Sequence, residues 1–105
     1  MDKAVREKIE QQVKGNKVFI YMKGSPQFPQ CGFSARACQI LNTLGTPYRH
    51  CDVLGNPDIR EGVKEFSNWP TLPQVYIDGK FVGGSDILSE LHERGELKKL
   101  AGVAP

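Results

Sequence analysis

Residues 18–44 read VFIYMKGSPQFPQCGFSARACQILNTL, and this stretch decides the fold. Its first part, 18–22, is an uninterrupted apolar run, which is typical of a strand buried on both faces of a sheet. The segment 23–30 contains two prolines and a glycine and therefore predicts a loop. From Gly32 to Leu44 apolar residues return every three or four positions, which predicts a helix that Gly45 ends.

The flanking sequence adds elements of the same two kinds. A helix joins the first two strands, so we expect them to be parallel with a right-handed crossover. Two β-rich runs around Asp78-Gly79 predict an antiparallel hairpin. The sequence thus predicts an α/β fold with a small mixed sheet and helices on both faces. The further expected elements are a helix over 2–13 capped by Asp2, a strand over 47–53, a helix to about Phe66 capped by Asn56, strands over 74–77 and 80–82, a helix capped by Ser85, and a short last helix with Leu97 and Leu100.

Composition excludes several classes of protein. The chain has 105 residues, which suits one domain, and a net charge of +2, too even to indicate binding to nucleic acid or an anionic membrane. The longest apolar run, 18–22, is far too short to span a bilayer, and the N-terminus lacks the apolar centre of a signal peptide. We therefore expect a reducing, cytoplasmic compartment, or an organelle matrix if a targeting segment has been removed.

Three cysteines, at positions 31, 38 and 51, make an odd number in a short chain, which argues against a secreted disulfide framework. None of them has the C-x-x-C spacing of a structural zinc site. Cys38 follows Cys31 by seven helical residues, roughly 10.5 Å, which exceeds the span of a disulfide. We expect Cys38 to pack under its helix and Cys51 to lie in a strand core, although sequence separation leaves open how far Cys51 is from Cys31.

Cys31 stands where a dithiol redox turn would carry its first sulfur, and Ser34 stands at the position of the second. The unpaired backbone N–H groups at the start of the helix favour a thiolate, as does the ammonium of Lys23 at the end of the preceding strand. We therefore predict a lowered pKa for Cys31. The alternative, a buried cysteine that packs as a small apolar residue, fits poorly with the surrounding prolines and glycine.

Two further motifs have a structural and a functional interpretation each. Pro73 in Trp69-Pro70-Thr71-Leu72-Pro73 either marks the start of a strand or follows a cis bond that turns the backbone of Leu72 toward a crevice. Gly83-Gly84-Ser85-Asp86 either ends the hairpin or forms a carboxylate-binding turn at a helix start. Arg60 on its own is most simply explained as part of a solvated helix face.

Taken together, these motifs resemble those of the monothiol, CGFS-type glutaredoxins. The likeness runs from about residue 5 to residue 100 and rests on four motifs in order: Lys23-Gly24-Ser25-Pro26, Cys31-Gly32-Phe33-Ser34, Trp69-Pro70-Thr71-Leu72-Pro73 and Gly83-Gly84-Ser85-Asp86-Ile87. It implies a thioredoxin fold with a four-stranded mixed sheet, a single glutaredoxin domain over residues 1–105, and a cis proline at Pro73.

The resemblance also implies a glutathione-binding groove. Lys23 and Arg60 would bind the glycine-end carboxylate, and the backbone at Leu72 and Pro73 would pair with the cysteinyl part. Ser85 and Asp86 would hold the γ-glutamyl end, with Ser85 contributing backbone more than side chain, because family members vary there. Cys31 would be the reactive or metal-ligating sulfur.

Two functions share this site. In the first, Cys31 of two chains and two glutathiones supply the four ligands of a labile 2Fe–2S cluster, so that a homodimer carries the cluster to recipient apoproteins, with a possible partner of the BolA type. In the second, Cys31 attacks glutathione mixed disulfides by a monothiol route. Phe33 and Ser34 depart from the C-P-Y-C pattern of efficient dithiol glutaredoxins, and the loop before Cys31 is longer. We therefore expect weak oxidoreductase activity and favour the cluster carrier.

Overall fold

The computed structural model describes residues 1–103 of the chain as alternating helices and strands. The elements, in chain order, are α1 (Lys3–Lys14), β1 (Val18–Met22), α2 (Gly32–Asn42), β2 (Arg49–Asp52), a short 3-10 turn η1 (Val53–Gly55), α3 (Pro57–Ser67), β3 (Gln74–Ile77), β4 (Lys80–Gly83), α4 (Ser85–Glu93) and α5 (Glu96–Leu100).

The strands form one four-stranded mixed sheet in the order β2-β1-β3-β4. β1 and β2 are parallel, with Tyr21 opposite Cys51, and β3 pairs antiparallel with β1 and with β4. The parallel first pair and the antiparallel hairpin confirm the predicted fold class. Because β1 has a strand on each side and helices pack on both faces of the sheet, all five of its residues are buried.

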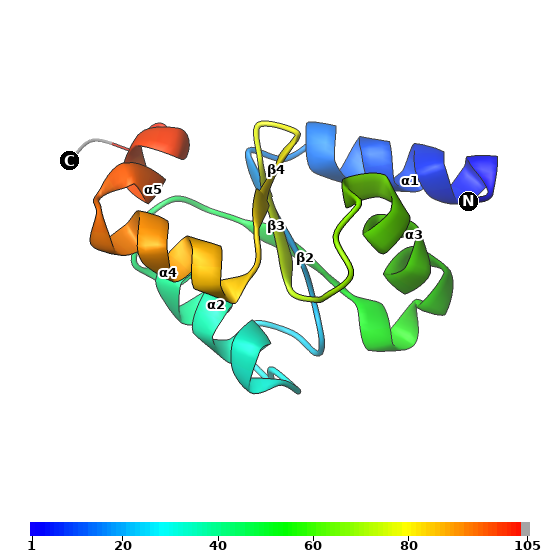
Figure 1. Ribbon diagram of the computed structural model, residues 1–105, viewed down its shortest axis with the longest axis horizontal. Helices are drawn as coiled ribbons and strands as arrows, with labels where there is room; N and C mark the ends of the chain where they lie inside the picture. The colour runs from blue at the N-terminus through cyan, green and yellow to red at the C-terminus, as the bar shows by residue number, and fades with distance from the viewer. Residues whose placement is uncertain (104–105) are drawn as a thin grey trace.

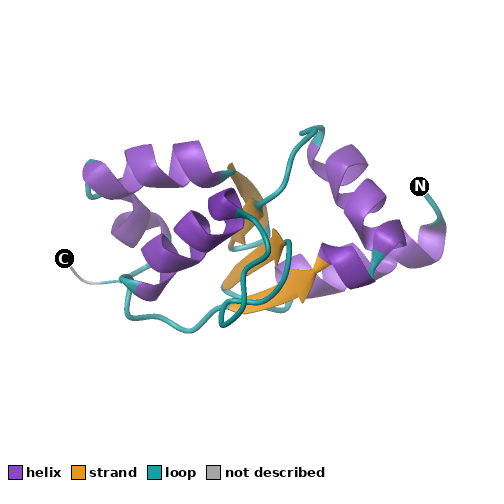
Figure 2. Ribbon diagram, turned by 90° about the horizontal axis from the view of Figure 1, so that it is seen from below, coloured by secondary structure: helices purple, strands orange, loops and turns teal. Residues whose placement is uncertain are grey.

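Helices cover the two faces of the sheet in separate groups. Figure 1 shows α1 and α3 on one side of the strands and α2, α4 and α5 on the other, and Figure 2 shows the same separation from below. Alternate residues of β1 face the two groups, as strand geometry requires: Ile20 belongs to the core under α2 and α4, whereas Tyr21 belongs to the core under α1 and α3.

The core under α1 and α3 is rich in aromatic rings. The ring centroid of Tyr76 lies 5.7 Å from that of Tyr21, 6.1 Å from that of Phe66 and 5.5 Å from that of Phe81. The opposite core is aliphatic and contains a sulfur pair, in which Cys38 Sγ lies 3.5 Å from Met22 Sδ. The aromatic core lies beneath the helix that carries Arg60.

Several predicted element ends differ from the observed ones. α2 ends at Asn42 rather than Leu44, because the Thr43 hydroxyl donates to the carbonyl of Ile40 and closes the last turn. The strand predicted over 47–53 is shorter, covering 49–52. Among residues 1–103, no helix combines the length and apolar composition needed to cross a bilayer.

Of the three predicted N-caps, two occupy the cap position and one does not. Asp2 caps α1 as expected, and its carboxylate accepts from the backbone N–H of Ala4 at 2.9 Å. Asn56 occupies the cap position of α3, but its side chain instead donates to the carbonyl of Asp52. The prediction that Ser85 caps α4 is wrong: Gly84 is the cap residue and Ser85 is the first residue of the helix.

Candidate functional site

A groove of about 420 Å³ opens beside Cys31, where five segments of the chain meet. Its walls are formed by the chain just after β1 at Lys23, the start of α2, the middle of α3, the loop 68–73 and the start of α4. All seven residues predicted from the sequence as site residues line it. The complete lining is Lys23, Cys31, Phe33, Arg60, Lys64, Trp69, Pro70, Thr71, Leu72, Pro73, Gly84, Ser85, Asp86 and Ile87.

Cys31 is the N-cap residue of α2, and its thiol is half-buried at the mouth of the groove. Its pKa is lowered from that of an ordinary thiol chiefly by the backbone N–H of Ser34, with further contributions from the backbone N–H of Phe33 and the charge of Lys23. Partial burial opposes this shift without reversing it. The predicted direction is therefore confirmed, and its main cause is the unpaired N–H groups at the start of the helix.

Ser34 has a structural role that sequence reasoning missed. Its side chain is fully buried, and its hydroxyl accepts a hydrogen bond of 3.1 Å from the backbone N–H of Lys23. This bond joins the first turn of α2 to the end of β1. The hydroxyl also contributes to lowering the pKa of Cys31. The position of the missing second sulfur is thus occupied by a group that fixes the first sulfur in place.

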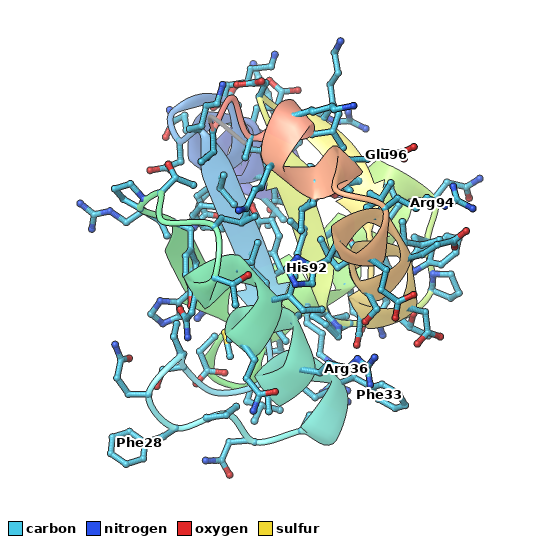
Figure 3. The ribbon with its side chains drawn as sticks, turned by 90° about the vertical axis from the view of Figure 1, so that its left-hand side faces the viewer. Phe28, Phe33, Arg36, His92, Arg94 and Glu96 are labelled. Carbon is cyan, nitrogen blue, oxygen red and sulfur yellow. The ribbon has the colours of Figure 1, made fainter. Side chains whose placement is uncertain are left out.

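The loop 23–30 that leads to Cys31 is held by its own hydrogen bonds. Gly24 has a φ of 88°, and a Cβ there would collide with the carbonyl oxygen of Phe28. The backbone N–H of Gly24 donates to the Asp52 carboxylate at 3.0 Å, and Ser25 and Phe28 close a tight turn. The turn exposes 74% of Phe28, and Figure 3 shows this ring and that of Phe33 pointing outward from their segments.

Three cations lie along one wall of the groove. Lys23 follows β1, whereas Arg60 and Lys64 stand one helical turn apart on α3. Lys64 has an exposed ion pair with Glu61 at 3.1 Å, but within residues 1–103 neither Lys23 nor Arg60 forms an ion pair. This wall therefore suits a ligand with a carboxylate.

The loop 68–73 presents free backbone groups to the groove. The Leu72–Pro73 bond is cis, as the sharper interpretation of the motif held. Within the described part of the chain, the backbone N–H of Leu72 donates no hydrogen bond. Gly84 approaches this segment so closely that a Cβ on it would lie 3.2 Å from the carbonyl oxygen of Pro73. The backbone of Leu72 is thus available to pair with an extended ligand.

The start of α4 closes the end of the groove. Asp86 is exposed in the first turn of the helix, whereas Ser85 is 5% exposed. The Ser85 hydroxyl is the one buried side-chain oxygen without a hydrogen-bond partner among residues 1–103. Backbone N–H groups at a helix start favour an anion, so this end of the groove offers a second carboxylate position.

Comparison with known proteins agrees with this geometry. The glutaredoxin family model matches residues 18–82. The chain belongs to the glutaredoxin family. A monothiol glutaredoxin (ycf64-like) of Synechocystis is 53% identical over 104 residues, covering 99% of this chain and 97% of that protein. Glutaredoxin 4 of Escherichia coli is 50% identical over 94 residues, covering 90% and 82%.

A solved structure shares the fold as well. The crystal structure of a buckwheat glutaredoxin–glutathione complex superposes with a TM-score of 0.84 at 26% identity, covering 98% of this chain and 94% of that one. With one cysteine in its Cys31-Gly32-Phe33-Ser34 motif, our protein is a monothiol glutaredoxin of the thioredoxin-like fold, homologous to the E. coli protein.

The groove of this glutaredoxin includes residues that the sequence analysis did not single out. Lys64 is the most informative of them, because it extends the cationic wall from Arg60. Its spacing of four residues from Arg60 on a predicted helix was a usable signal. Phe33, Trp69 and Ile87 belong to the motifs already quoted, but their exposure was not expected: they are large apolar groups of the lining, and each is at least 36% exposed.

The other two cysteines of this glutaredoxin lie outside the groove. Cys38 is buried in the aliphatic core and Cys51 in the aromatic core, so the sheet separates them. Burial raises the pKa of both thiols. Within the described residues, no cluster of three or more His, Cys, Asp or Glu side chains is placed to hold a metal ion. Cys31 is therefore the one accessible thiol that residues 1–103 offer.

Proposed function

We propose that this monothiol glutaredoxin binds glutathione in the groove and, as two chains, carries a labile 2Fe–2S cluster for iron–sulfur cluster assembly and transfer. The observation that carries the proposal is the environment of Cys31. Its thiol is accessible and has a lowered pKa, and no second cysteine adjoins it. A thiolate in this state suits metal ligation and has no partner for an internal disulfide.

The groove supports glutathione as the small ligand. Glutathione has a carboxylate at each end and a thiol between them. The cations Lys23 and Arg60 suit one carboxylate, and the start of α4 suits the other. The unpaired backbone of Leu72 lines the same groove and would pair with the cysteinyl part. In this pose the ligand thiol would come close to Cys31.

A second chain is needed because one chain and one glutathione supply too few ligands for a 2Fe–2S cluster. A 2Fe–2S cluster takes four ligands, usually thiolates. Each chain would supply Cys31 and each bound glutathione one further thiolate, so two of each complete the set. When bound, the cluster serves as cargo, and half of its ligands are exchangeable. This makes the assembly suitable for transfer to recipient apoproteins, and a BolA-type protein is a candidate partner.

Anaerobic reconstitution with iron, sulfide and glutathione tests the carrier function. We expect the visible absorption of a 2Fe–2S centre together with a mass, by analytical ultracentrifugation, of two chains. Cys31→Ser should remove both signals. Cys38→Ser is the matched control, since it changes a buried thiol outside the groove and should retain them. A colourless monomer from the wild-type chain would contradict the proposal.

A second function is favoured by the same lowered pKa of Cys31. The Cys31 thiolate would attack the glutathione sulfur of a mixed disulfide, forming a Cys31–glutathione disulfide and releasing the target thiolate, which takes up a proton. A second glutathione thiolate would then attack the glutathione sulfur of this Cys31–glutathione disulfide, giving glutathione disulfide and restoring the Cys31 thiolate. No second cysteine is needed.

Steady-state turnover of a glutathionylated peptide separates the two functions. We expect the wild-type chain to turn over slowly compared with a dithiol glutaredoxin measured alongside it. Turnover as rapid as that of the dithiol enzyme, from a chain that does not hold a cluster, would make thiol exchange the main function.

A further inference from the structure

Gln74 is a buried polar residue directly behind the groove. It is the first residue of β3, follows the cis bond to Pro73, and has no exposed surface. It does not itself line the groove. Burying a primary amide is unfavourable unless its donors and acceptor are hydrogen-bonded. The partners of this side chain therefore indicate what it does.

Both N–H groups of the Gln74 amide point to the groove loop. Nε2 donates to the backbone carbonyl of Trp69 at 3.1 Å and to that of Thr71 at 3.3 Å. These two carbonyls flank Pro70, and all three loop residues are exposed and line the groove. The loop is thus held from its inner side by one amide.

The loop has few other internal restraints. Pro70 and Pro73 lack a backbone N–H. Within residues 1–103, the N–H groups of Thr71 and Leu72 donate no hydrogen bond. The backbone N–H of Trp69 donates to the end of α3, at the carbonyl of Lys64, but this bond lies at the entrance of the loop. From there to the start of β3, the two bonds from Gln74 are the hydrogen bonds that hold the described backbone, and the ring of Trp69 packs on that of Phe81 with centroids 5.8 Å apart.

The amide itself is oriented by the core. Its Oε1 accepts a hydrogen bond of 3.0 Å from the hydroxyl of Tyr76. The Tyr76 ring is buried between Tyr21, Phe66 and Phe81. Because the Tyr76 hydroxyl holds Oε1, the Nε2 atom of the Gln74 amide faces the loop.

We infer that Gln74 is a positioning residue for glutathione: its amide holds the loop 68–73 in the conformation that presents the free backbone of Leu72 to the ligand. This inference rests on the proposed function, because it takes glutathione as the ligand of the groove. Holding the loop before binding removes the entropy cost of ordering it on binding. Gln74 acts through Leu72 and does not touch the ligand.

The test compares Gln74→Met with Tyr21→Phe. Gln74→Met keeps the length and volume of the side chain but removes its hydrogen bonds. Tyr21→Phe removes a partly buried hydrogen bond of 2.7 Å from a tyrosine of the same aromatic core to Gln12, and leaves the groove loop untouched. Both variants lose partly buried side-chain hydrogen bonds, but only Gln74→Met loses bonds to the loop.

Two measurements report on the loop and on the ligand separately. Trp69 is the one tryptophan of the chain and belongs to the loop, so acrylamide quenching of its fluorescence reports loop mobility without ligand. Calorimetric titration with reduced glutathione gives the affinity. We expect Gln74→Met to raise quenching and to weaken glutathione binding by about ten-fold. Tyr21→Phe should change either quantity by less than about two-fold.

Unchanged quenching and affinity in Gln74→Met, or equal losses in Tyr21→Phe, would overturn the inference. If the wild-type chain does not bind glutathione, the proposed function fails, and the quenching comparison still decides whether Gln74 holds the loop.

Should Gln74→Met not fold, side-chain amide exchange in the wild-type chain decides the same point. The NH₂ protons of Gln74 should exchange far more slowly than those of the exposed Gln27. Equal exchange rates would refute the inference.

Discussion

At the scale of the residue, position 34 explains how one cysteine can remain a usable ligand. A second cysteine there would be free to close a disulfide with Cys31. Ser34 instead uses its hydroxyl to bond the backbone of Lys23, and its backbone N–H is the largest contribution to lowering the pKa of Cys31. Serine in place of cysteine at position 34 therefore prevents a disulfide with Cys31 and still favours the thiolate form of Cys31.

One prediction separates two contributions to the lowered pKa of Cys31: the charge of Lys23 and the backbone N–H groups at the start of α2. In Lys23→Gln the ammonium is lost, so the rate of Cys31 alkylation by iodoacetamide should reach its half-maximum at a higher pH. A higher pKa means less thiolate at neutral pH, so the neutral rate should fall. The midpoint should stay below that of an ordinary thiol, because the N–H groups of Ser34 and Phe33 remain.

Lys80→Gln removes the same charge from an exposed residue of β4 outside the groove and serves as the control. Its midpoint should equal that of the wild-type chain. An identical midpoint in Lys23→Gln would show that the lysine does not act on Cys31.

At the scale of the element, α3 owes its position to a glycine. A Cβ on Gly62 would lie 2.7 Å from Val5 Cγ1 and 3.0 Å from Ile9 Cδ1, so α1 packs so closely on α3 that any larger residue would push these side chains aside. The same helix carries Arg60 and Lys64 into the groove. The packing of α1 therefore places the cationic wall.

Gly62→Ala is predicted to destabilise the chain by up to about 2 kcal/mol. Overpacking costs about 1–3 kcal/mol, and the gain in helix propensity of about 1 kcal/mol offsets part of it. Urea unfolding followed by circular dichroism measures the difference.

Gly55→Ala is the matched control for that experiment, because a Cβ there meets no atom within 4 Å. It should leave the free energy of unfolding within about 0.5 kcal/mol of wild type. Equal stabilities of the two variants would show that α1 yields to the added methyl group.

The start of α4 differs from the prediction that Ser85 is its N-cap. Serine is a common N-cap, so it was the reasonable choice from sequence. The observed cap is Gly84, whose close approach to the carbonyl of Pro73 leaves little room for a side chain. The contact between Gly84 and the loop at Pro73 therefore set where α4 begins, and the preference of serine for the N-cap did not.

At the scale of the whole molecule, the fold keeps the three thiols apart. Cys38 and Cys51 lie in the two cores on opposite faces of the sheet, and Cys31 opens into the groove. We predict that oxidation of the native chain by diamide forms no intramolecular disulfide. Intact-mass analysis should show no loss of two hydrogens within one chain.

Labelling with N-ethylmaleimide gives an independent measurement. One label per chain is expected under native conditions, on Cys31, because burial protects Cys38 and Cys51 and raises the pKa of each. In urea all three should react. A chain that loses two thiols while folded would show that one of the cores opens to the other or to the groove.

The sequence determined the order and kind of the elements, the parallel first pair and the hairpin, because hydrophobic period, glycine and proline act locally. It also identified Cys31 and the motifs around it, and the direction of the Cys31 pKa followed from its place at a helix start. All seven predicted site residues line one groove, although they come from five separate segments.

Only the tertiary structure decided the strand order, the cis bond at Pro73 and the separation of the cysteines by the sheet. It also revealed Lys64 in the groove wall and the bonds from Gln74 to the loop. These features depend on which segments meet in space. A hydrophobic period tells which side of a strand or helix is buried, but which remote segment covers that side follows from packing of the whole chain.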